Sequence, residues 1–217
     1  VSLDFGGSWF TQFPVRQFEA TPDSLTLLRG ESFFVEPRRA RLTVEELLRA
    51  HVAKPAQGQT WEVPQADAFW RVAEFPMLVE QGINTSAKVA EHYEFDPRQS
   101  SYYRQAAEFL GLVYSEKGTY RLTDLGREYT TRTADERRQL LAGILAEFPP
   151  MRALLELSAK AGTRGIGRSE ITALISRHST IGKSTPNRRA VTLSCWLRWL
   201  QAATGAVKEK QERFVLN

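Results

Sequence analysis

The chain has 217 residues, of which 42% are hydrophobic and 25% charged, so it can bury one large core or two smaller ones. No apolar run approaches the roughly 20 residues of a membrane-spanning helix, and residues 1–13 lack the basic start and apolar run of a signal peptide. We therefore expect a folded cytoplasmic protein without a membrane partner. The single cysteine, Cys195, excludes an internal disulfide, and its apolar helical surroundings favour core packing.

The formal net charge of +4 is concentrated in the C-terminal quarter of the chain. Residues 1–62 carry 7 basic and 8 acidic side chains, residues 63–162 carry 12 and 14, and residues 163–217 carry 10 and 3. The net charges of these segments are therefore −1, −2 and +7. A local basic excess favours attraction to phosphate groups, because screened charges act over short distances. A basic face that only contacts solvent is the alternative.

Residues 1–62 read as a small element without a chemical motif. Two β-prone runs, 24–28 and 32–35, flank a turn that contains Gly30 and predict a hairpin. A capping box that begins at Thr43 predicts a helix to His51, and a breaker-rich connector follows it. We interpret 1–62 as an arm or docking element, followed by one domain at 63–132 and a second at 133–217.

Residues 63–132 show the apolar spacing of three helices followed by two short strands. Pro76 is expected to break or kink the first helix near Phe75. Residues 84–86 supply the cap of the second helix, and Asp96 with Pro97 opens the third. This order is that of a winged helix-turn-helix unit. The helices are expected at 66–81, 87–93 and 97–110, and the strands at 112–114 and 119–122.

The same order recurs in residues 133–217. Pro149-Pro150 separates two helices, a polar turn precedes a helix that opens at Pro186, and a second hairpin closes the chain. The predicted class is therefore mainly α with small β wings (α+β), with two consecutive winged helix-turn-helix units after a small β-containing N-terminal element. The helices are expected at 134–148, 151–161, 170–178 and from 186, and the strands at 206–208 and 213–216.

The third helix of each unit carries the side chains suited to reading DNA. A recognition helix enters the major groove with its N-terminal half, and arginine, glutamine and asparagine match guanine and adenine edges. A polar face that is simply solvated is the alternative. The predicted base contacts are Arg98, Gln99, Ser101, Tyr102, Gln105, Asn187, Arg188, Arg189 and Thr192. The predicted phosphate contacts from wings and turns are Lys117, Arg121, Lys183, Ser184, Thr185, Lys208 and Lys210.

Two groups of residues carry a resemblance to a known family. The first is Asp96-Pro97-Arg98-Gln99, Tyr102-Tyr103, Ala106-Ala107, Leu110-Gly111-Leu112 and the run 120–126; the second is Asn187-Arg188-Arg189-Ala190 and Trp196-Leu197-Arg198-Trp199. Together, over about residues 64–217, they resemble the tandem winged-helix modules of proteins such as type II restriction endonucleases. The resemblance implies target-site recognition, with a nuclease as a separate domain or subunit.

No catalytic constellation accompanies these motifs. A metal-dependent nuclease requires two or three carboxylates and a lysine that converge on strand ends, and no Glu-x-Lys in a strand context follows Asp23, Glu31 and Glu36. The three histidines share no metal-binding spacing. We therefore expect no enzyme activity, metal or cofactor, but sequence-specific binding of double-stranded DNA within a bacterial restriction-modification system. A transcription regulator and a protein-interaction module are the alternatives, the latter because residues 63–162 are slightly acidic.

Overall fold

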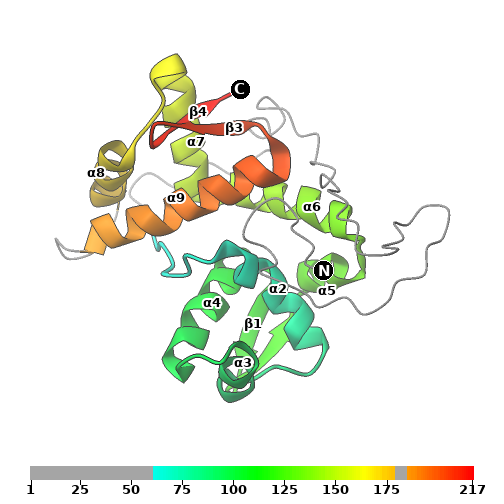
Figure 1. The fold of residues 1–217 in the computed structure, drawn as a ribbon. Coiled ribbons are helices and arrows are strands. Elements are labelled where there is room, and N and C mark those ends of the chain that lie inside the picture. Colours follow the sequence, from blue (N-terminus) through cyan, green and yellow to red (C-terminus); the bar gives the residue numbers. More distant parts are fainter. Residues whose placement is uncertain (1–60, 179–184) are drawn as a thin grey trace, which may run out of the picture. The chain divides into compact units, whose positions relative to one another are not determined.

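Helices make up most of the described chain, and the strands form two separate two-stranded antiparallel sheets (Figure 1). The computed structural model describes residues 61–178 and 185–217, which all belong to one compact unit. The prediction of a mainly α protein with small β hairpins is confirmed at this level. The hairpin and helix expected within 1–62, and the turn at 179–184, lie outside the described residues.

The first helix–hairpin array follows the predicted order of elements. Thr85 and Asp96 act as N-caps, since their side chains accept hydrogen bonds from the backbone N–H groups of Lys88 and Arg98. Lys117 and Gly118 both have positive φ, the geometry of a tight hairpin turn. The array consists of α2 (Phe69–Glu80), α3 (Ser86–Tyr93), α4 (Pro97–Phe109), β1 (Val113–Glu116) and β2 (Thr119–Leu122).

Two local features of this array differ from the sequence-based expectation. Pro76 does not break α2, which continues to Glu80 with the proline ring buried; packing against α4, α5 and α9 outweighs the loss of one backbone hydrogen bond. Helix α5 (Asp124–Thr131) was not predicted at all. Thr123 caps α5 by accepting from the N–H of Gly126 at 2.9 Å. A Cβ on Gly126 would lie 1.9 Å from the carbonyl oxygen of Leu112, so only glycine lets α5 approach so closely.

The second helix–hairpin array runs from α7 to β4, and α6 precedes it. Thr133 and Glu136 form a capping box at the start of α6, and the helices α6 and α7 meet at Phe148, immediately before Pro149 as predicted. Gln211 and Glu212 have positive φ, like the turn of the first hairpin. The elements are α6 (Ala134–Glu147), α7 (Pro149–Ala161), the 3-10 helix η1 (Gly162–Arg164), α8 (Arg168–His178), α9 (Thr185–Thr204), β3 (Val207–Lys210) and β4 (Arg213–Leu216).

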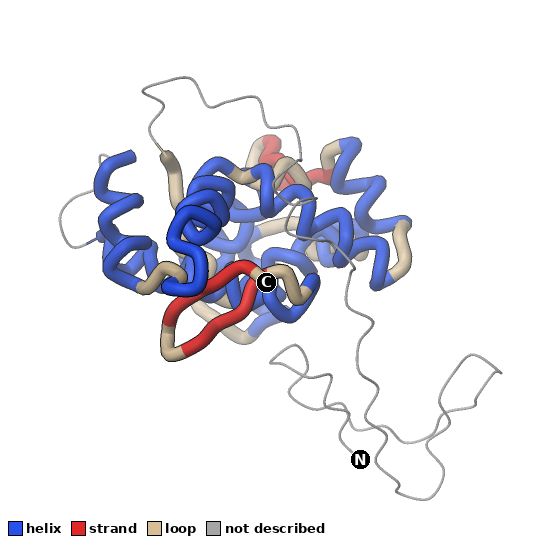
Figure 2. Tube along the Cα trace, turned by 90° about the horizontal axis from the view of Figure 1, so that it is seen from above, coloured by secondary structure: helices blue, strands red, loops and turns tan. Residues whose placement is uncertain are grey.

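The two arrays share a detail of their backbone hydrogen bonding. In each, a residue just ahead of the second helix forms an isolated antiparallel bridge to the closing strand of the hairpin: Thr85 with Thr119, and Ile166 with Phe214. In the second array the N–H groups of Ile166 and Phe214 each donate to the other's carbonyl, at 2.9 and 2.8 Å. Each bridge joins its hairpin to the segment ahead of the second helix, and Figure 2 shows the hairpins, in red, beside the helices. The arrays therefore repeat one backbone plan.

A buried aromatic joint connects the arrays. Phe69 of α2 packs against Trp196 and Trp199 of α9, with ring centroids 4.9 and 4.6 Å apart. The Nε1–H of Trp196 donates to the carbonyl of Ala66 at 2.7 Å. Trp61, Trp196 and Trp199 are buried, and Trp70 is half-buried. Because full burial of an aromatic side chain stabilises by a few kcal/mol (about 1.5–3 for Phe), the joint holds α2 and α9 together.

Candidate nucleic-acid interface

The first turns of α4 present polar side chains outward. Arg98, Gln99 and Gln105 are exposed, whereas Ser101 and Tyr102 are half-buried. The opposite side of the helix is packed as its spacing predicts, with Tyr103, Ala106, Ala107 and Leu110 buried. All five side chains predicted to contact bases thus lie outside the core.

The start of α9 follows the same pattern with one exception. Asn187 and Arg188 are exposed and Arg189 is half-buried. Thr192, predicted as a base contact, has an exposed fraction of only 3%, so that assignment is corrected. The reason is that α9 packs against α2, α6, α8 and β3, which bury more of its circumference than one apolar stripe suggests.

The two helix starts lie next to each other. A concavity of about 340 Å3 is lined by Asp96, Arg98, Gln99 and Tyr102 from α4 and by Arg188 from α9. Burial and the neighbouring Arg188 lower the pKa of Arg189, and Tyr102 acts on it in the opposite direction. Side chains from both arrays therefore share one surface, a juxtaposition that the sequence did not reveal.

This surface is positively charged. Arg98, Arg188 and Arg189 form no ion pair with any described carboxylate, and the Nε of Arg189 is buried without a hydrogen-bond partner in the described part of the chain. The carboxylate in the concavity, Asp96, already caps α4. The N-terminal end of a helix also favours anions. The surface is therefore suited to a polyanion.

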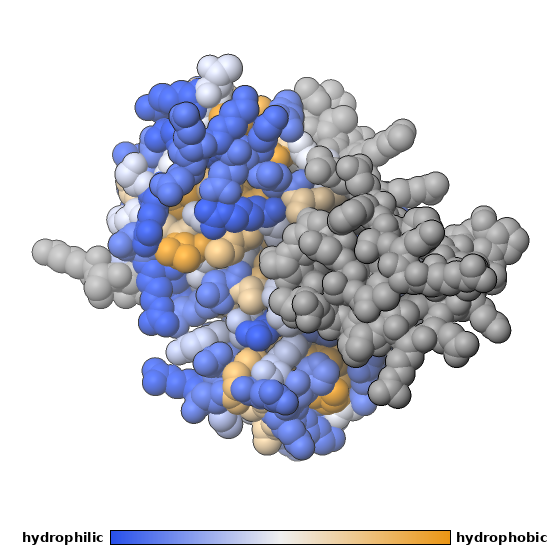
Figure 3. Space-filling model, in the orientation of Figure 1, coloured by the Kyte–Doolittle hydropathy of each residue, from blue (hydrophilic) through white to orange (hydrophobic). Residues whose placement is uncertain are grey.

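Helix α8 extends this surface with residues that the sequence analysis missed. Arg168, Ser169, Thr172 and Ala173 of α8 line a second open concavity together with Asn187 of α9. The Nε–H of Arg168 donates to Oδ1 of Asn187 at 2.9 Å. Arginine and serine at the first positions of a short helix were the available signal. The margin of the molecule over α8 and the first turns of α9 is mainly hydrophilic, at the left of Figure 3.

The two hairpins differ in how their charges are engaged. On the first, Lys117 is exposed at the turn, but Arg121 pairs with Glu116 at 2.5 Å. On the second, Lys208 and Lys210 are exposed on one side of β3. Lys183 and Ser184 lie outside the described residues; Thr185 opens α9, but its side chain is not described.

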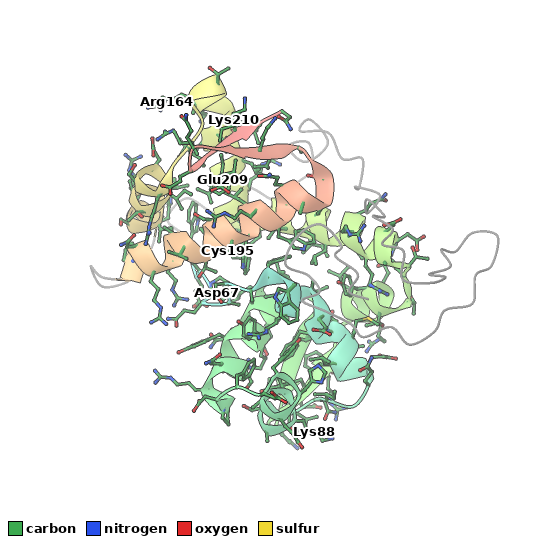
Figure 4. All side chains as sticks on the ribbon, viewed as in Figure 1. Asp67, Lys88, Arg164, Cys195, Glu209 and Lys210 are labelled. Atoms are coloured by element: carbon green, nitrogen blue, oxygen red, sulfur yellow. The ribbon has the colours of Figure 1, made fainter. Side chains whose placement is uncertain are left out.

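Glu209, which lies between Lys208 and Lys210 on β3, faces helix α9. Nε and Nη2 of Arg198 each donate a hydrogen bond to a carboxylate oxygen of Glu209, both at 2.8 Å. Figure 4 shows Glu209 between β3 and α9. The alternation of a strand therefore turns Glu209 inward and leaves the lysines outward. Lys210 lies near Arg164 at the end of the hairpin (Figure 4), where its strand partner Arg213 donates to the carbonyl of Arg164.

Arg213 fastens the second hairpin to α8. Its Nη2 donates to the carbonyl of Gly165 at 2.9 Å and to Glu170 at 2.6 Å. Hydrogen bonds from Arg213 and then Ser169 lower the pKa of Glu170 to about 2. The hairpin and the start of α8 are thereby held as one piece.

The described residues give no support for a metal site or a membrane-spanning helix. Within 61–178 and 185–217, no three His, Cys, Asp or Glu side chains form a group that could hold a metal ion. His92 and His178 are exposed, and Cys195 is half-buried, with its pKa raised by desolvation. Among the described helices none has the length and apolar character to cross a membrane.

The family model of a domain of unknown function (DUF7226) matches residues 71–204. The chain belongs to this family. The match extends from α2 to the last residue of α9 and includes both helix starts that line the shared concavity, whereas the second hairpin lies beyond it. Comparison with curated proteins and with solved structures gives no match.

Proposed function

We propose that this chain binds double-stranded DNA sequence-specifically through two winged helix-turn-helix units in tandem, with α4 and α9 as the recognition helices. The observation that carries the proposal is the shared concavity, into which Arg98, Gln99 and Arg188 project without a competing ion pair from the described carboxylates. The repeated order of three helices and a bridged hairpin supports the winged-helix assignment.

The side chains of the two helix starts suit the edges of base pairs. In helix-turn-helix proteins the N-terminal residues of the second helix of the motif contact bases in the major groove. Arg98 and Arg188 can each donate two hydrogen bonds to O6 and N7 of guanine, and Gln99 can pair with adenine. Tyr102, half-buried between the helices, supplies an apolar surface beside them.

The exposed cations on the two hairpins and on α8 suit phosphates. Lys208 and Lys210 on the second hairpin, Lys117 on the first and Arg168 on α8 are exposed and form no ion pair among the described residues. Each phosphate contact releases condensed counterions, so the affinity for DNA falls steeply with salt. These side chains fix the orientation of the chain on the duplex, while the helix starts read its sequence.

The biological setting that we propose is target recognition in a restriction-modification system. The support is the resemblance of residues 96–126 and 187–199 to the winged-helix modules of type II restriction endonucleases. In this proposal the chain selects the site and makes no bond changes itself, and the nuclease is a separate domain or subunit. Transcription regulation would use the same DNA-binding surface.

Binding of a labelled duplex pool by the full chain at two salt concentrations tests the proposal. Between about 50 and 200 mM salt, we expect the affinity to fall about five hundredfold, for roughly five phosphate contacts. Arg188→Ala should weaken binding. The matched control is Arg127→Ala on α5, which Figure 1 places on the opposite side from the start of α9. Affinity that is insensitive to salt, or that is equal in the parent chain and both variants, would instead favour a protein-docking module.

A further inference from the structure

We infer that one copy of the chain reads a single uninterrupted and asymmetric duplex sequence, with the starts of α4 and α9 over adjoining base pairs of the same stretch of major groove. The inference rests on the proposed DNA-binding function and names the class of target. It differs from the arrangement of helix-turn-helix dimers, whose two recognition helices read separate half-sites about one helical turn, ~34 Å, apart.

The first argument is the closeness of the two helix starts. Arg188 of α9 lines the same concavity as Arg98 and Gln99 of α4, and that concavity measures about 340 Å3. This is the space of about eleven water molecules, at ~30 Å3 each. Side chains that share so small a space cannot reach groove segments a full helical turn apart. They can reach neighbouring base pairs in one groove, which is about 12 Å wide.

The second argument is the rigidity of the joint between the arrays. Trp196 is fully buried, stacks edge-on against Phe69 and is hydrogen-bonded to Ala66. A second tie joins the residues ahead of α2 to the end of α8: the N–H of Trp61 donates to the carbonyl of His178 at 2.7 Å, and their rings stack at 4.1 Å. The spacing of α4 and α9 is thus set by packed side chains, and one fixed register of bases follows.

The third argument is the difference between the side chains of the two helices. Palindromic sites mirror proteins that present identical side chains to both halves. Here α4 presents Arg98 and Gln99, whereas α9 presents Arg188 and an asparagine, Asn187, that is held by Arg168 of α8. Each helix thus offers one guanidinium and one carboxamide, but in opposite order along the chain, and the carboxamide oxygen of Asn187 is already engaged by Arg168. The preferred sequence should therefore lack two-fold symmetry.

Selection from random duplexes tests this inference with the full chain. Bound duplexes are recovered over several rounds and sequenced. We expect one block of preferred base pairs, contained within about one helical turn, ~10 base pairs, and without a palindrome. Two blocks separated by unselected base pairs, or a palindrome, would overturn the inference while leaving sequence-specific DNA binding intact. Binding without enrichment, or no binding of any duplex at any salt concentration, would overturn the proposed function itself.

Variants then show which positions of the block are read by α4 and which by α9. In repeated selections, Arg98→Ala and Arg188→Ala should each relax the preference at different but adjoining positions of the same block, and Arg127→Ala should leave it unchanged. Insertion of two base pairs between those positions should weaken binding by at least about tenfold, because the joint cannot lengthen; one lost base-edge contact has this size. Tolerance of the insertion would overturn the inference.

Discussion

The two helix–hairpin arrays share a backbone plan but differ in the use of their charges. In both, a tight turn with positive φ closes the hairpin, and a bridge ahead of the second helix holds it. The first array lies in the segment with net charge −2, and its hairpin arginine, Arg121, is paired with Glu116. The segment 163–217 has net charge +7, and Lys208 and Lys210 are outward. Fold and charge are thus set by different residues.

The largest effect should follow from breaking the joint between the arrays. Trp196→Ala removes a fully buried ring and its hydrogen bond to Ala66 and should lower the free energy of unfolding by roughly 3–5 kcal/mol. Denaturant unfolding followed by circular dichroism measures this. Trp70→Ala, at a half-buried ring, is the control and should cost clearly less. Equal losses for both variants would mean that the joint does not hold the arrays together.

The next effect separates the contributions of the arrays to binding. Arg188→Ala and Arg98→Ala should each reduce the affinity for a selected duplex by roughly 1–3 kcal/mol. Arg188 should matter more, because it sits beside Arg189 in the basic segment. Fluorescence anisotropy measures the affinities, and unchanged melting temperatures would show that both variants fold. A larger loss of affinity for Arg98→Ala than for Arg188→Ala would contradict the expectation that α9 contributes more to binding than α4.

The hairpins offer a smaller and sharper contrast. Lys208→Ala and Lys210→Ala should each reduce the slope of log affinity against log salt by about one, the signature of one lost phosphate contact. Arg121→Ala should reduce it by less, because Glu116 already neutralises that arginine. The measurement is a salt titration of duplex affinity for each variant. Equal slopes in all three would remove the distinction between the hairpins.

The smallest effect concerns the brace between the second hairpin and α8. The pKa of Glu170 is lowered from its usual 4.5 to about 2. A carboxylate with a lowered pKa contributes stability above its unfolded pKa and loses it as the pH falls through the folded value. Glu170→Gln should cost up to about 1 kcal/mol near neutral pH, and the difference from the parent should shrink between pH 4.5 and 2. Unfolding curves across this range test it; a difference independent of pH would contradict it.

Local signals explain how much of the fold could be predicted from sequence. Asp96 with Pro97, the capping box at Thr133, and Pro149 each mark a helix end through a specific backbone hydrogen bond or its absence. Helix α5 is not signalled by apolar spacing, because its first residues, Asp124 to Gly126, follow strand β2 almost directly. Its glycine is required by a backbone contact with Leu112, which lies on another element.

The candidate site was predictable only in part for the same reason. The helical period correctly separated the outer face of α4 from its buried face. It could not show that four elements pack around α9 and bury Thr192. Nor could it show that Arg188 meets Arg98 across one concavity, or that Arg168 joins Asn187. These are tertiary contacts, and no periodicity of a single segment records them.

Hydrogen exchange with and without a selected duplex tests the central claim most directly. If the starts of α4 and α9 together form the DNA-binding surface, peptides that cover 96–105 and 186–192 should both gain protection in the complex, while α5 should not change. Protection of only one of these segments, or of α5 instead, would contradict the account.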